Sequence, residues 1–398
     1  MEKLKPITPG AEIGDTKAEA IHVREKIERV KILWRTLLRR WEEQGTTEDP
    51  LAKLSEETVQ DEDNFKETVV EILDCSDEEA EILYEEARKI RNAHIGDDVR
   101  LRATVQVTNV CRENCLCCPM RRDNINPEVI KRMDSNEIVS AVDRAYVAGI
   151  RDMFIQGGED VVTVPVVVEA LKAVHKKYSD IEVVLNLGNL SREQYQSFSD
   201  AGVKKYVIKY ETSNPKIHEV LRQSSIEKRI QHTMYARQAG LEIGSGNIIG
   251  LPEQTDKDLA SDILLLGRLG VKDMISSTTY TSSEVLPEPY RSQQAGDWEK
   301  SKRFIALLRI CFPSANIEAP SNVDGSKIIR TKKEVLGQTE LIMSGANEIM
   351  VEFTPQEMAE NYGLYDTGEK RHVINIVKAK NVLGEVEQIK SELKSVDI

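Results

Sequence analysis

The chain lacks two features that would place a protein in or across a membrane. None of its apolar runs approaches the roughly 20 residues that a membrane-spanning helix needs. Its first residues, Met1 to Pro6, lack the apolar core of a signal peptide. We therefore expect a cytoplasmic protein that has no membrane partner and whose cysteines are reduced.

An excess of basic residues is also missing. The chain of 398 residues carries 54 Lys and Arg against 67 Asp and Glu, which gives a net charge of −13. A general nucleic-acid binder would carry a basic face that attracts phosphate groups. The charge balance therefore argues against nucleic acid as a partner and otherwise indicates solubility.

Most of the sequence contains no pairs of cysteine or histidine residues at the spacing of metal ligands. The six histidines show no paired spacing, and no second Cys-x2-Cys or His pair follows the cysteine-rich stretch. A structural zinc site needs such a second pair. A disulfide is not expected either, because the chain shows no sign of export. Zinc and disulfide frameworks are therefore disfavoured.

Cysteine is instead concentrated in one short stretch, Cys111-Arg-Glu-Asn-Cys115-Leu-Cys117-Cys118. Cys111, Cys115 and Cys118 have the spacing Cys-x3-Cys-x2-Cys, so one loop can aim three thiolates at a single point. An iron–sulfur cluster needs ligands arranged in this way. A [4Fe–4S] cube usually takes four cysteines, so three ligands would leave one iron open to bind a substrate.

The amino-terminal part of the chain is predicted to be helical. Between about residues 16 and 41, apolar side chains recur at helical spacing with arginines between them: Ile27, Val30, Trp34, Leu37, Leu38 and Trp41. Such a helix either docks an acidic partner or packs on its own domain, and we favour packing. A second helical region covers about 51–94, and its last helix begins at Ser76 with a capping box to Glu79.

From Val99 onward, strands alternate with helices. We expect strands near 101–108, 152–156, 182–187, 204–210, 242–249, 272–278, 315–319 and 347–351. We expect helices near 135–148, 163–177, 191–201, 226–239, 255–269, 296–311 and 329–343. Eight such units predict an α/β fold, a (β/α)8 TIM-type barrel, and a doubly wound open sheet is the alternative.

This pattern divides the chain into three parts. Residues 1–96 form an amino-terminal helical extension, 97–355 the barrel, and 356–398 a helical or irregular carboxyl-terminal segment. The active site of such a barrel lies at the carboxyl ends of its strands. The cysteine loop and three polar groups follow predicted strands: Gly157-Gly158-Glu159-Asp160, Lys209-Tyr210-Glu211-Thr212 and Gly250-Leu-Pro-Glu253.

The cysteine spacing resembles that of the radical S-adenosylmethionine (SAM) superfamily. In that family the open iron is chelated by the amino and carboxylate groups of the methionine part of SAM. The resemblance implies that Cys111, Cys115 and Cys118 hold the cluster and are catalytic. The residue before the last cysteine is usually aromatic, but here it is Cys117. Either Cys117 fills that place or it competes with Cys118 as ligand, and we favour Cys118 because only it has the x2 spacing.

The resemblance also implies a set of SAM-binding residues. Gly157 and Gly158, with Glu159, would hold the SAM amino group. The stretch from Gly246 to Glu253 matches the pattern Gly-x-Ile-x-Gly-x-x-Glu, in which the apolar residue, here Ile248, packs on adenine.

Charged residues complete the implied SAM site. Glu211 would accept the ribose hydroxyls, although it could equally be an acid at a helix amino terminus. The SAM carboxylate would face Lys209 or Arg229, and the choice between them stays open. Arg121 and Arg122 follow the cysteines and could counter the anionic cluster or belong to a solvated loop.

Further stretches narrow the resemblance to the group of biotin synthase, HydE and methylornithine synthase, with HydE nearest. They include Glu86–Asn92, Asp98–Arg102, Thr108–Cys115, Arg121–Asn124, Tyr210–Pro215, Ser344–Asn347 and Glu352–Pro355. The segment Ser276–Glu284 is richer in hydroxyl groups than we expect of HydE, and Tyr280, Ser282 and Ser283 are candidates for its substrate end.

The function implied is a radical SAM enzyme. Such an enzyme cleaves SAM reductively to a 5′-deoxyadenosyl radical, here for cofactor or small-molecule biosynthesis as in HydE. Reduced ferredoxin or flavodoxin would supply the electron. The alternatives are a carbon-skeleton mutase, a sulfur-insertion enzyme or a non-catalytic cluster carrier. Sulfur insertion as in biotin synthase would need extra cysteines at strand ends, and Cys75 and Cys311 do not lie there.

Overall fold

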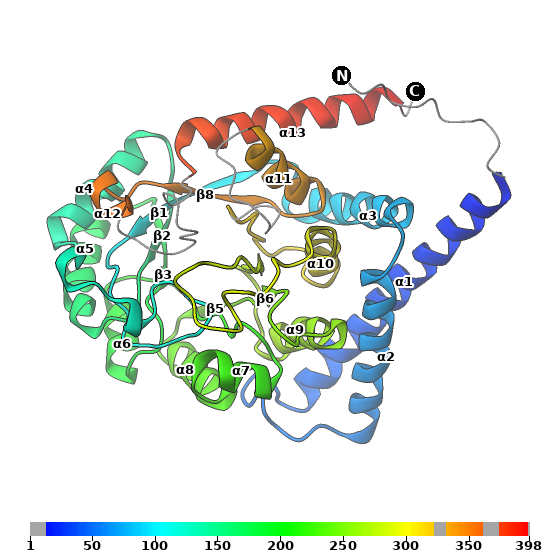
Figure 1. The fold of residues 1–398 in the computed structure, drawn as a ribbon, viewed down its shortest axis with the longest axis horizontal. Coiled ribbons are helices and arrows are strands. Elements are labelled where there is room, and N and C mark those ends of the chain that lie inside the picture. The colour runs from blue at the N-terminus through cyan, green and yellow to red at the C-terminus, as the bar shows by residue number, and fades with distance from the viewer. Residues whose placement is uncertain (1–12, 322–331, 361–373, 397–398) are drawn as a thin grey trace.

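A computed structural model describes residues 13–321, 332–360 and 374–396 of the chain. Its centre is a parallel sheet in the order β5-β4-β3-β2-β1-β8 (Figure 1). The strands are β1 (Arg100–Gln106), β2 (Asp152–Gln156), β3 (Glu182–Asn186), β4 (Lys205–Val207), β5 (Glu242–Gly244) and β8 (Glu348–Glu352). The predicted α/β fold is confirmed.

Short parallel contacts close the sheet into a ring. Single bridges join Ser245 to Ile275, Ile275 to Ile317 and Glu318 to Glu348. The predicted strands at 272–278 and 315–319 are therefore present mainly as bridges. Beyond this ring, β6 (Ile248–Ile249) pairs with β7 (Thr278–Thr279).

The register has the stagger of a closed barrel. Following the paired residues once around the ring from Arg100 leads back to the first strand at about Thr108. A displacement of about eight residues over eight strands is the shear of a (β/α)8 barrel. The carboxyl ends of all the strands therefore open on the same side.

Helices cover the outside of the ring. They are α4 (Ser135–Val147), α5 (Val164–Lys177), α6 (Arg192–Asp200), α8 (Ile226–Gln238), α9 (Asp256–Arg268), α10 (Trp298–Cys311) and α11 (Lys332–Met343). Capping boxes begin α4, α6 and α9, as their Asp134, Ser191 and Thr255 caps dictate. No helix of the described ranges has the length and apolar character of a membrane span.

Helix α7 (Pro215–Arg222) is not among the predicted helices, whereas α12 (Gln356–Glu360) and α13 (Ile376–Val396) lie in the segment 356–398 that was expected to be helical or irregular. Of these, α13 packs along α11 (Figure 1). Part of the predicted helix at 329–343 and part of the segment 356–398 lie outside the described residues.

The amino-terminal helices α1 (Ile13–Glu43), α2 (Glu56–Leu73) and α3 (Asp77–Ile95) pack on the barrel beside α9 and α10 (Figure 1). The Trp34 ring lies 5.5 Å from Trp41 and 5.0 Å from Phe312, between ring centres. Packing of α1 on its own chain is therefore confirmed. Leu38, expected on the apolar face, is 42% exposed, because its neighbour Leu37 occupies the centre of that face.

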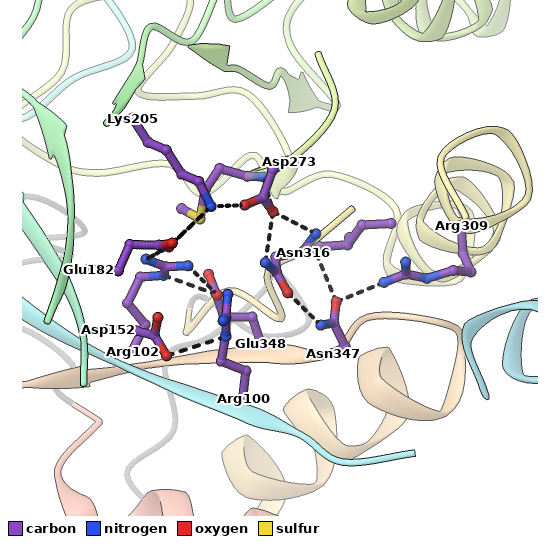
Figure 2. A network of polar contacts seen from close by, with 12 residues as sticks. Arg100, Arg102, Asp152, Glu182, Lys205, Asp273, Arg309, Asn316, Asn347 and Glu348 are labelled. Carbon is purple, nitrogen blue, oxygen red and sulfur yellow. Dashed lines mark hydrogen bonds and ion pairs between the residues drawn. The ribbon is translucent and has the colours of Figure 1, made fainter. Parts of the chain in front are cut away.

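A network of charged and amide side chains fills the amino-terminal end of the barrel (Figure 2). Arg102 has a fully buried side chain and lies 2.9 Å from Glu348 and 3.6 Å from Glu182, between ion-pair atoms. Lys205 lies 3.1 Å from Glu182 and 2.5 Å from Asp273. This base network closes one end of the barrel, so that a ligand can enter only from the other.

Candidate active site

A cavity of about 270 Å³ opens at the carboxyl ends of the strands. Above the base network, the apolar side chains of Phe154, Val207, Met274 and Met350 form its floor. Most of the residues singled out from the sequence line this one cavity: Cys111, Cys115, Cys117, Cys118, Gly157, Gly158, Glu159, Lys209, Glu211, Arg229, Ile248, Tyr280, Ser282 and Ser283. Gly250 and Glu253 do not line it.

The cysteine loop is held by its own polar residues. The Arg121 guanidinium donates to Asn114 Oδ1 at 2.8 Å and lies 3.0 Å from Asp123 Oδ2. The Leu116 amide donates to the Leu221 carbonyl at 2.8 Å, which ties the loop to the end of α7. Arg121 therefore braces the loop from outside the cavity, and Arg122 is exposed.

The chemistry of the thiols suits a multi-iron cluster. Burial raises the pKa of Cys111 to about 11 and also raises the pKa values of Cys115 and Cys118, so that bound iron would have to displace their protons. In the described ranges, no three His, Cys, Asp or Glu side chains converge as ligands of a single metal ion. Three thiols on one loop at the cavity wall can each bind a different iron of one cluster.

The turn after β2 packs directly against the cysteine loop. A Cβ atom on Gly158 would lie 2.1 Å from the Val110 carbonyl oxygen, so only glycine fits there. The Glu159 amide donates to Cys111 Sγ at 3.3 Å. The turn and the first thiol are therefore fixed relative to each other.

The Glu159 carboxylate already has partners within the protein. Arg112 donates to Oε1 at 2.8 Å, and the Asn189 amide donates to Oε2 at 2.7 Å. Gly188, at φ +76°, lets Glu159 approach, since a Cβ there would lie 2.4 Å from Oε2. Glu159 therefore anchors the turn, and its carboxylate is already engaged within the protein.

Three cations surround the upper cavity, and their partners differ. Lys209 Nζ donates to Thr278 Oγ1 at 3.1 Å and lies 3.6 Å from Glu211 Oε2. Arg229 is held by Asn189 Oδ1 at 2.6 Å and by the Lys209 carbonyl at 2.8 Å. Arg222, at the end of α7, lines the cavity near Cys115 and was not singled out from the sequence.

Glu211 combines a special backbone with an incomplete side-chain environment. Its φ is +69°, and its Oε2 atom is buried without a hydrogen-bond partner. A buried carboxylate oxygen that lacks a donor costs free energy unless a ligand supplies one. Glu211 therefore has an acceptor atom available for a hydroxyl group.

The segment after β5 divides into a lining part and a supporting part. Ile248 faces the cavity from β6. Gly250, at φ +93°, lies so close to Gly296 that a Cβ would approach it to 2.4 Å. Glu253 is exposed at φ +63°. Both Gly250 and Glu253 thus shape the turn outside the cavity.

Asp262 supports two cavity turns from behind and is fully buried. It accepts from the Ser213 amide at 2.6 Å and from Asn247 Nδ2 at 2.8 Å. Burial raises its pKa to about 7, against the hydrogen bonds that lower it. The sequence carried no signal for Asp262, Asn189 or Arg222, because each lies on a helix or loop away from the motifs.

Comparison with known proteins agrees with this geometry. Residues 105–266 match the family model described as "Radical SAM superfamily". The [FeFe] hydrogenase maturase subunit HydE of Thermotoga maritima is 34% identical over 72% of this chain and 79% of its own length. A biotin synthase of Geobacillus thermodenitrificans is 28% identical over 52% of this chain and 63% of its own length.

A solved structure shares the fold. The crystal structure of methylornithine synthase (PylB) superposes with a TM-score of 0.65 at 19% identity, covering 92% of this chain and 99% of that one. The expected relationship to the HydE and biotin synthase group is thus confirmed. The chain is an enzyme of the radical SAM superfamily, whose members bind a [4Fe–4S] cluster and S-adenosylmethionine.

Proposed function

We propose that this enzyme cleaves SAM reductively in the cavity and uses the resulting radical on a small molecule, as a HydE-like biosynthetic enzyme. The observation that carries the proposal is that three thiols and the Glu211 carboxylate, whose buried Oε2 atom accepts no hydrogen bond within the protein, line the same cavity. The 34% identity to HydE supports the finer assignment. When bound, the cluster supplies the electron that splits SAM into methionine and a 5′-deoxyadenosyl radical.

In this proposal, Cys111, Cys115 and Cys118 hold the cluster. Cys117 lines the same cavity and packs against the apolar group that includes Tyr280 and Tyr290, so we assign it a packing role. It therefore takes the place of the aromatic residue that the family usually has. The loop is preorganised for this task by Arg121 and Asn114.

The walls of the cavity would orient SAM. The carbonyls of Gly157 and Gly158 accept from its ammonium group, and Glu211 Oε2 accepts from a ribose hydroxyl. Ile248 packs on the adenine. For the SAM carboxylate we favour Arg229, with Arg222 beside it, because Lys209 is already engaged by Glu211 and Thr278. We assign no SAM contact to Gly250 or Glu253.

The rest of the chain would enclose the reaction. The base network shuts the amino-terminal end, so water can reach a radical only through the cavity mouth. We propose that residues 97–355 form the catalytic unit, supported by the helices of 1–96 and by 356–398.

A reduced ferredoxin or flavodoxin would donate the electron. A protein partner of α1 would meet its exposed arginine edge, since the apolar face is buried.

The test is anaerobic SAM cleavage. The protein is reconstituted with iron and sulfide, supplied with SAM and a strong reductant, and assayed for 5′-deoxyadenosine. We expect product from wild type, and SAM binding weaker by about 1–3 kcal/mol in Glu211→Gln. Glu169→Gln, at an exposed site on α5, is the matched control. A complete cluster that yields no 5′-deoxyadenosine, with or without added cell metabolites, would favour a non-catalytic cluster carrier.

A further inference from the structure

The lower half of the cavity, here called the inner chamber, contains more than the SAM motifs explain. Above its apolar floor lie two carboxylic acids, Glu318 and Glu352, together with the hydroxyl groups of Thr104 and Ser276. Glu318 bridges to Glu348 of β8, and Glu352 lies in β8 itself, which pairs with β1. None of these four side chains is among the SAM contacts assigned above.

Glu318 lacks a cationic partner among the residues that the structure describes. Among the described residues its one hydrogen-bond partner is Ser276, and no Lys, Arg or His nitrogen lies within ion-pair distance. Arg102, the cation of the base network, is engaged by Glu348 at 2.9 Å. Lys209 is engaged by Glu211. The cations near Glu318 are thus committed to other carboxylates.

Glu352 marks a second acceptor in the same chamber. Gln106 and Thr354 donate hydrogen bonds to its carboxylate and hold it in place. Thr104 is the cross-strand neighbour of Glu352 and is 4% exposed. Thr104 lines the chamber, and its buried Oγ1 atom has no hydrogen-bond partner. A built, polar and incompletely satisfied site therefore exists at this wall.

We propose that the inner chamber binds a substrate that carries a protonated amine, whose ammonium group is received by Glu318, with Glu352 and Thr104 as further acceptors. The inference rests on the proposed function and names the class of molecule on which the radical acts. An ammonium group offers three donors, which matches carboxylate and hydroxyl acceptors.

The charge balance decides between substrate classes. A buried carboxylate without a cation is costly, and burial raises the pKa of Glu318 accordingly. A substrate ammonium offsets that cost, whereas a substrate carboxylate placed there meets like charge in a medium of low dielectric. The apolar floor of Phe154, Val207 and Met274 suits a hydrocarbon chain beside the amine.

The experiment compares three probes of equal chain length with different charge: pentane-1,5-diamine, pentane-1,5-diol and glutarate. Each is titrated calorimetrically into the anaerobic, cluster-loaded enzyme saturated with SAM and without reductant. We expect the diamine to bind at least tenfold more tightly than the diol or glutarate. Glu318→Gln should lower diamine affinity at least tenfold, and Glu169→Gln, on the outer surface of α5, should not.

Two outcomes overturn the proposal: glutarate or the diol binding as tightly as the diamine, or unchanged diamine affinity in both Glu318→Gln and Glu352→Gln. The second variant covers a failure of the first to fold, which circular dichroism and iron content detect. The reductive 5′-deoxyadenosine assay is scored separately. Amine selectivity without SAM cleavage would refute the proposed function alone, and SAM cleavage without amine selectivity would refute this inference alone.

Discussion

The two ends of the barrel are built from the same kinds of residue and differ in how those residues are paired. At the base, Arg102 and Lys205 each lie within ion-pair distance of two carboxylates. In the inner chamber, Glu318 has a serine as its partner and Thr104 Oγ1 has none. Mutual pairing favours stability of the closed end, whereas unpaired groups at the open end favour binding of a ligand.

This difference in pairing indicates which end of the barrel binds a ligand. Charge alone does not distinguish the two ends, since both contain buried acids and bases. The distinguishing property is whether each buried charged group lies within ion-pair distance of an opposite charge. Breaking a pair at the base should therefore cost stability, and changing the open end should cost activity.

The largest expected effect lies at the open end. Cys118→Ala should abolish [4Fe–4S] assembly and SAM cleavage, because two thiols of this loop cannot replace three. Iron content and the visible absorbance of the reconstituted protein measure it. Cys117→Ala is the matched control and should retain the cluster. Retention in Cys118→Ala with loss in Cys117→Ala would reverse our choice of ligand.

The next effect lies at the base. Glu348→Gln should destabilise the fold by about 3–5 kcal/mol, because Arg102 then keeps a buried charge without its nearest partner. Denaturant unfolding followed by circular dichroism measures the loss. Replacing both partners, as Arg102→Met with Glu348→Leu, should restore most of it. A single variant as stable as wild type would show that the base does not depend on this pair.

Asp262 should give the fold a distinctive pH dependence. Because its folded pKa of about 7 exceeds the usual 3.8, the folded state keeps a proton that the unfolded state releases. Its contribution to the unfolding free energy therefore falls as pH rises from about 4 to about 7, by up to about 1.4 kcal/mol per pH unit. Asp262→Asn should remove that slope.

The measurement for Asp262 is the melting temperature of wild type and Asp262→Asn at several pH values across this window. The difference between the two proteins should change with pH in favour of the variant as pH rises. Parallel curves would mean that Asp262 stays ionised, held by the Ser213 and Asn247 donors.

The smallest expected effect on stability is that of Glu318→Gln, and it tests the difference between the two ends of the barrel most directly. Glu318→Gln should change the unfolding free energy by less than about 1 kcal/mol, or raise it, because no ion pair is lost and a buried charge is removed. The same denaturant titration used for Glu348→Gln checks it. A loss as large as that of Glu348→Gln would place Glu318 with the base network rather than with the chamber.

The sequence predicted those parts of the fold that depend on neighbours along the chain. Alternation of strand and helix located the ring and seven of the helices, and the Ser76–Glu79 capping box is present. Where prediction fell short, competition from tertiary packing explains it. Leu38 follows the helical pattern, but Leu37 occupies the buried face in its place, and α7 has only eight residues, little more than two turns.

In the candidate site, too, some features follow from the local sequence and others only from the tertiary structure. The spacing of Cys111, Cys115 and Cys118 is confined to one loop, so the chain alone determined that three thiols can converge. Whether Glu318, Thr104 and Glu352 face one chamber depends on strand register around the closed ring, which no local pattern records. Only the tertiary structure decided which buried charges are paired, because pairing joins residues from strands far apart in the sequence.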